Sequence, residues 1–158
     1  MTASSGEGHD FSALVARELN RLAREVEAYD DEAELWLVRG AQKNSAGTLA
    51  LHVCGFLHHF IGAGLGQNGY VRDRPAEFSD RVSRAELLER IEHCSQVVTG
   101  VLDGLDTEAM EAEYPGDPPA HMAGTRTRPF LVHLVWHIGW HLGHIYYHRL
   151  GADGAEPA

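Results

Sequence analysis

Residues 128–150, RPFLVHLVWHIGWHLGHIYYHRL, contain the densest group of histidines in the chain. Five of them lie within sixteen residues: His133, His137, His141, His144 and His148. Each residue of an α-helix advances by about 100°, so the five would share one stripe about 80° wide. On a β-strand they would mostly point to alternating faces. The spacing therefore predicts a helix that carries a histidine stripe.

The other positions of this helix are apolar on nearly every side. A helix that is apolar all round is a buried helix, and burying an unpartnered imidazole costs free energy. Neutral imidazole is a good metal ligand, and two histidines four residues apart on a helix can bind one ion. We therefore expect a divalent metal ion at the stripe. The alternative is a set of core histidines that hydrogen-bond to their neighbours.

The composition describes an acidic chain of 158 residues, with a net charge of −10 when the histidines are neutral. Its twelve arginines and one lysine are scattered, so no basic stripe suggests nucleic acid, and anionic lipid would repel the surface. The first ten residues lack the basic start and apolar core of a signal peptide. We expect a cytoplasmic protein that binds neither nucleic acid nor membrane. Cys54 and Cys94 are expected to be reduced, buried thiols, with one disulfide as the alternative.

Four segments repeat apolar residues every three or four positions, which predicts helices over about residues 11–29, 45–64, 84–103 and 129–150. No strand pattern is comparably strong. Four long helices in one domain predict an all-α fold of the four-helix-bundle type. We expect this domain to cover residues 9–150, with flexible tails at residues 1–8 and 151–158.

The predicted helix ends follow from capping residues. Asp10 and Asn44 suit the N-caps of the first two helices, and Ser83 begins a capping box before the third. Residues 67–82 and 105–127 are expected to be loops. The second loop is long for a compact domain, and connections of this length are usually either functional or disordered.

Three stretches of this sequence together resemble the DinB-like (YfiT-like) superfamily of metal-binding four-helix bundles. Residues 44–52, NSAGTLALH, are similar to the second helix of that family, whose motif ends in a metal-binding histidine. Residues 72–78, RDRPAEF, are similar to a charged loop that follows this helix in one branch. Residues 137–145, HIGWHLGHI, are similar to its two-histidine motif, with His144 in place of a glutamine. The resemblance extends from about Phe11 to Leu150.

By motif match, the resemblance implies His52, His137 and His141 as metal ligands. Three imidazoles leave one coordination position open, which is the pattern of catalytic zinc sites. We expect zinc or nickel, with iron and manganese as alternatives because three imidazoles suit several metals.

Four further side chains are expected beside the ion or in its pocket: His133, His144, His59 and Asp73. Asp73 shares a charged loop with Glu77, and solvated loop charges are the more common interpretation of both. His148 lies beyond the last turn of the site and is expected at the surface or an interface. Cys54 is expected to pack in the core.

The family resemblance implies several activities. Some members are transferases or isomerases that use a low-molecular-weight thiol such as mycothiol or bacillithiol, and others are described as metal-dependent hydrolases. We expect transfer of such a thiol to an electrophilic substrate, with Arg126 and Arg128 as candidate anchors for the thiol. The alternatives are a hydrolase that uses metal-bound water and a non-catalytic, stress-linked metal-binding protein.

A homodimer is also expected, because many members of the family pair and because the fourth helix is apolar around its whole circumference. Trp136, Trp140 and Tyr147 flank the histidine stripe on one side. A partner subunit would bury this side. In the alternative, the loop over residues 105–127 folds over it.

Overall fold

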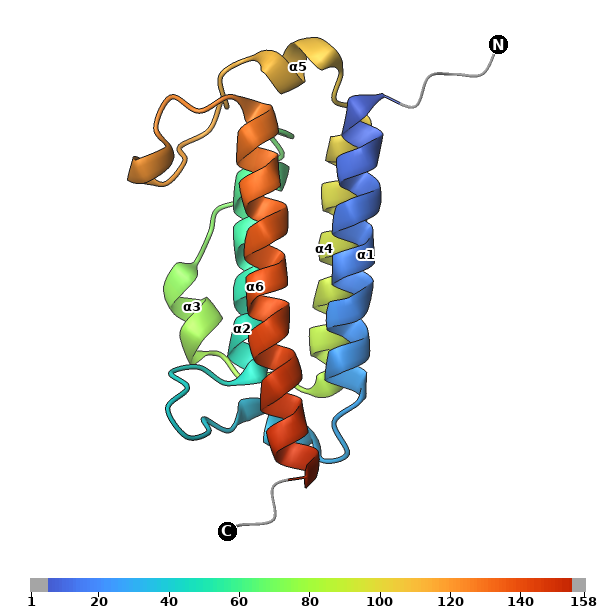
Figure 1. Cartoon of the computed structure of the whole chain (residues 1–158), viewed down its shortest axis with the longest axis vertical. Coiled ribbons are helices and arrows are strands. Elements are labelled where there is room, and N and C mark those ends of the chain that lie inside the picture. The colour runs from blue at the N-terminus through green and yellow to red at the C-terminus, as the bar shows by residue number, and fades with distance from the viewer. Residues whose placement is uncertain (1–5, 155–158) are drawn as a thin grey trace, which may run out of the picture.

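The computed structural model describes residues 6–154, and the predicted all-α class is confirmed within them. Figure 1 shows four long helices side by side: α1 (Glu7–Glu27), α2 (Ala46–Leu57), α4 (Arg84–Asp103) and α6 (Thr127–Gly154). Helices α1 and α2 each pack against both α4 and α6. Within residues 6–154, the only β-type pairing is one antiparallel bridge between Glu113 and Arg126.

Five short elements occupy the connections between the long helices: η1 (Glu32–Trp36), η2 (His58–Ala63), α3 (Arg74–Ser79), α5 (Thr107–Glu111) and η3 (Ala120–Met122). The π-helical η2 continues α2 directly. The short helix α3 lies within the segment expected to be a loop, and the side chain of Asp73 caps its first turn. Figure 1 shows α3 standing beside α2. This arrangement brings the charged residues of α3 to α2.

Helix α1 begins earlier than its apolar pattern predicts. Its N-cap is Gly6 instead of Asp10. The first turn packs closely against α4, where a Cβ on Gly8 would lie 2.0 Å from the carbonyl oxygen of Leu102. Residues 7–8, at the start of α1, and residues 151–154, at the end of α6, both expected in the tails, are helical. The rest of the expected tails, residues 1–5 and 155–158, lies outside the described residues.

Two other helix starts test the capping predictions. The N-cap of α2 is Ser45 instead of Asn44, because the Ser45 hydroxyl accepts the Thr48 N–H at 3.1 Å. Helix α4 begins as predicted, with the Ser83 hydroxyl accepting the Glu86 N–H at 3.1 Å.

Helix α2 is buried along its whole length, with all twelve of its residues buried. Its glycines allow close approach. A Cβ on Gly47 would lie 2.6 Å from the Trp36 ring, and a Cβ on Gly55 would lie 2.0 Å from a Glu77 carboxylate oxygen. The stretch Ala46–Ala63 is long and apolar enough to span a membrane by length and composition alone, but 67% of it is buried within the chain. A core helix passes the same test.

Both cysteines are free and buried, as predicted. They lie where α2 meets α4, with Cys94 Sγ 3.8 Å from the Cys54 carbonyl oxygen. Cys54 belongs to the hydrophobic core.

Helix α6 is not buried on every side, which corrects the expectation from its composition. Trp136 is 57% exposed, Trp140 56% and Tyr147 69%. The opposite side of the helix is buried, as at Ile138 and Ile145. The part of the chain that the structure describes therefore leaves an aromatic face of α6 exposed.

Candidate metal centre

Three histidines from two helices come together where α2 faces α6. His52 on α2 faces His137 and His141 on α6, and one ligand nitrogen of each lies within 4.8 Å of the others. The Nε2 atoms of His137 and His141 are 3.0 Å apart. Two nitrogens bound to one zinc ion at about 2.0–2.1 Å in tetrahedral geometry lie about 3.3 Å apart. The His137–His141 pair is close to this spacing, and the three histidines together could hold a metal ion.

The electrostatics of the two α6 histidines suit a ligand role. Burial, with a smaller contribution from His52, lowers the pKa of His137 to about 4. Burial, followed by the neighbouring His137, lowers the pKa of His141 to about 3. Both imidazoles are therefore neutral at pH 7 and offer lone pairs to a cation.

Glu77 orients His52, and its predicted role as a solvated loop charge is wrong. Its side chain is 6% exposed, and its Oε2 atom is 2.8 Å from His52 Nδ1. Arg72 donates two further hydrogen bonds to the same carboxylate, at 2.6 and 2.8 Å. An ionised carboxylate only accepts, so His52 Nδ1 carries the proton and Nε2 is free to bind a metal. Such a carboxylate partner is typical of metal-bound histidines.

The ionised state of Glu77 follows from these contacts. Burial raises the pKa of its carboxyl, but the hydrogen bonds from Arg72 and His52 outweigh burial and make the net shift downward. Gly55 makes the arrangement sterically possible, since any side chain there would collide with the carboxylate. No periodic pattern in the sequence marks Glu77, which lies in the segment 72–78 of the family resemblance.

His148 is a buried histidine with a structural role. It is 1% exposed, which corrects the expected surface position. Its Nδ1 is 2.6 Å from the Tyr29 hydroxyl, and its Nε2 is 2.7 Å from the Leu37 carbonyl oxygen. A carbonyl only accepts, so Nε2 donates to it and Nδ1 accepts from the hydroxyl. Both ring nitrogens are thus satisfied by the protein.

The histidine trio differs from His148 in this respect. The Nδ1 atom of His141 is buried and has no hydrogen-bond partner within residues 6–154. The trio is therefore not a closed hydrogen-bond network of core histidines. A metal ion between these histidines would bind His141 through Nε2, which lies 3.0 Å from His137 Nε2. The unpaired Nδ1 therefore shows only that the protein does not satisfy both nitrogens of His141, as it does for His148.

Two of the four expected pocket residues lie beside the trio. The His133 ring centroid is 5.9 Å from that of His137, and the His144 centroid is 6.4 Å from that of His141. Asp73 instead caps α3, accepting the Ala76 N–H at 3.0 Å, and lines a different cavity. His59 contacts the ring of Phe60 and lines neither of the two cavities beside the trio.

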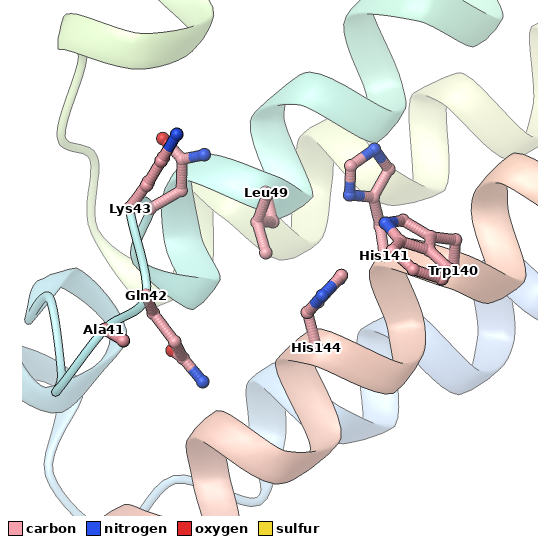
Figure 2. A pocket seen from close by; sticks show the side chains of 8 residues that line it. Ala41, Gln42, Lys43, Leu49, Trp140, His141 and His144 are labelled. Carbon is pink, nitrogen blue, oxygen red and sulfur yellow. The ribbon is translucent and has the colours of Figure 1, made fainter.

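A larger cavity opens beside His141, between α6 and the loop that precedes α2 (Figure 2). Its volume is about 480 Å³. The α6 side carries Trp140 and His144, and Leu49 forms an apolar wall. The loop side carries polar residues that sequence reasoning missed: Gln42, Lys43 and Asn44. We call this space the His141 cavity.

A smaller cavity of about 220 Å³ lies on the other side of the trio and touches His52 and His137. Pro119, from the long loop over residues 105–127, is part of its wall. We call it the His52 cavity.

Arg126 and Arg128, the expected thiol anchors, form ion pairs with carboxylates away from the trio. Both form ion pairs with Glu111, and Arg128 also pairs with Glu7. These ion pairs link the start of α6 to α5 and α1. Neither arginine lines a cavity beside the trio.

Comparison of the chain with protein-family models, with curated proteins and with solved structures finds no match. The function of this chain is therefore inferred from its own residues and their geometry.

Proposed function

We propose that this protein is a divalent-metal-dependent enzyme with a DinB-like four-helix bundle, and that it transfers a low-molecular-weight thiol to an electrophilic substrate. The observation that carries the proposal is the trio of His52, His137 and His141 with a cavity on either side. Zinc or nickel is the proposed metal and the cytoplasm the proposed compartment.

A bound divalent ion with three imidazole ligands would lower the pKa of a thiol in the open coordination position. The chain's own thiols do not compete for this role, because Cys54 and Cys94 are buried in the core. The nucleophile is therefore proposed to come from outside the protein.

The His141 cavity is the proposed thiol site. Its polar loop residues Gln42, Lys43 and Asn44 offer hydrogen bonds to the polar body of a thiol cofactor, and Lys43 is the only lysine of the chain. Figure 2 shows His144 facing this space beside His141. We propose that His144 accepts the proton that the thiol releases. A sulfur–carbon bond then forms as the carbon–leaving group bond breaks, and the leaving group departs with the electron pair and takes up that proton.

Addition of a small thiol to the cobalt-loaded protein should produce a sulfur-to-cobalt charge-transfer band that saturates with thiol concentration. The titration uses 2-mercaptoethanol and follows the near-ultraviolet absorbance. The His141→Ala variant should lack the band, whereas His59→Ala should keep it because His59 lines neither cavity. A spectrum unchanged by thiol would reject thiol transfer and leave the hydrolase and the non-catalytic metal binder as the remaining functions.

The proposed partner of the chain is a second copy of itself. Exposed aromatic residues follow the outer face of α6, and Gly139 and Gly143 have no atom within 4 Å of an added Cβ. Close approach of a second α6 would bury this face.

Light scattering should therefore give twice the chain mass of 17.4 kDa at micromolar concentration. Tyr147→Glu places a charge on the exposed α6 face and should shift the protein toward monomer. Val71→Glu is the matched control, since Val71 is 87% exposed and lies outside α6. A wild-type mass equal to one chain would reject the dimer.

A further inference from the structure

The His52 cavity combines an aromatic wall with a basic rim. Phe56, Phe60 and Phe130 supply rings, and Arg72 and Arg74 supply guanidinium groups. Apolar walls with a few polar groups are typical of small-molecule sites. The volume of about 220 Å³ is below the roughly 300 Å³ at the lower end of such sites, which favours a small ligand.

The charge at this rim is not neutralised by the protein. Most arginines of this acidic chain pair with carboxylates, but Arg74 forms no ion pair within residues 6–154. Its guanidinium lies 5.0 Å from the centroid of the Phe78 ring, which is itself 5.3 Å from the His52 ring centroid. The Arg74 guanidinium, which has no carboxylate partner among the described residues, therefore lies near His52, a predicted metal ligand.

Arg72 adds donors to the same rim. Its Nε and Nη2 atoms bond to Glu77, while its Nη1 atom makes no hydrogen bond within the described part of the chain. Because Arg72 and Glu77 neutralise each other, the excess positive charge comes from Arg74. Guanidinium groups bind carboxylates through paired hydrogen bonds, which are stronger than those between neutral groups.

We propose that the His52 cavity binds a small aromatic or unsaturated carboxylate. Its carboxylate pairs with Arg74, supported by the free donors of Arg72, and its planar body packs against the phenylalanine rings. Assignment of this acid as the electrophilic substrate rests on the proposed thiol transfer, in which one carbon of its planar body carries the leaving group that the sulfur displaces. The thiol and the acid then approach the trio from opposite cavities.

The test is a titration of the zinc-loaded full chain with 4-fluorobenzoate, followed by ¹⁹F NMR. Binding should be saturable, and Arg74→Gln should weaken it about tenfold, the effect of losing one charge-assisted hydrogen bond. Arg81→Gln is the matched control, because Arg81 is an exposed arginine of the same segment that lines neither cavity. The uncharged 4-fluorobenzamide should bind about tenfold more weakly and should not respond to Arg74→Gln.

Equal affinity of wild type and Arg74→Gln for 4-fluorobenzoate would overturn the proposal. The proposal would also be overturned if binding of 4-fluorobenzoate required the metal but was unchanged by Arg74→Gln, because the carboxylate would then be a metal ligand. The thiol titration separates this inference from the proposed function. Arg74-dependent benzoate binding without a thiol band would support the acid site and reject thiol transfer. A thiol band without benzoate binding would support thiol transfer and reject the acid site.

Discussion

Replacement of His141 by alanine should remove most of the bound metal, with a loss of affinity of more than about a hundredfold, beyond the 10–100-fold expected for loss of an outer hydrogen-bond partner. The ligand nitrogens of His52, His137 and His141 lie within 4.8 Å of one another, so each variant lacking one of them removes a third of the donor set. Elemental analysis of the purified protein and competition with a chelator would measure the loss.

Two controls bracket this prediction. His59→Ala should keep its metal, because His59 lies outside the trio. Glu77→Gln should have an intermediate effect of about 10–100-fold, because it disturbs the partner of His52 Nδ1 and leaves all three imidazoles in place. Circular dichroism would establish that each variant is folded. Full metal occupancy in a folded His52→Ala variant would contradict the ligand assignment.

Replacement of His148 by alanine should destabilise the fold by about 2–4 kcal/mol, the range for a buried side chain whose loss leaves a cavity and broken hydrogen bonds. The imidazole joins the Tyr29 hydroxyl to the Leu37 carbonyl oxygen. It therefore connects α6 to the end of α1 and to the segment that leads to the His141 cavity. Urea unfolding of the metal-free proteins would measure the difference, because bound metal adds its own stabilisation.

His144→Ala provides the comparison on the same helix. His144 is exposed and makes no hydrogen bond within residues 6–154, so its removal should change the free energy of unfolding by less than about 0.5 kcal/mol. Equal unfolding free energies for the two variants would show that His148 has no structural role.

Periodicity in the sequence determined the long helices. The predicted span 84–103 agrees with α4, whose start depends on a hydrogen bond between neighbours in the chain. The same local geometry predicts that His137 and His141 lie on one face of one helix. Such features depend on residues a few positions apart, and helical rotation fixes their relation before any packing occurs.

Tertiary structure decided which groups those faces meet. Glu77 and His52 are 25 residues apart, and only the packing of α3 against α2 brings their side chains within hydrogen-bond distance. His148 shares the predicted stripe of His141, yet it finds Tyr29 and Leu37, more than a hundred residues away, instead of the trio. Helical phase specifies the direction of a side chain but not the neighbour in that direction, because the neighbour depends on how separate helices and loops pack.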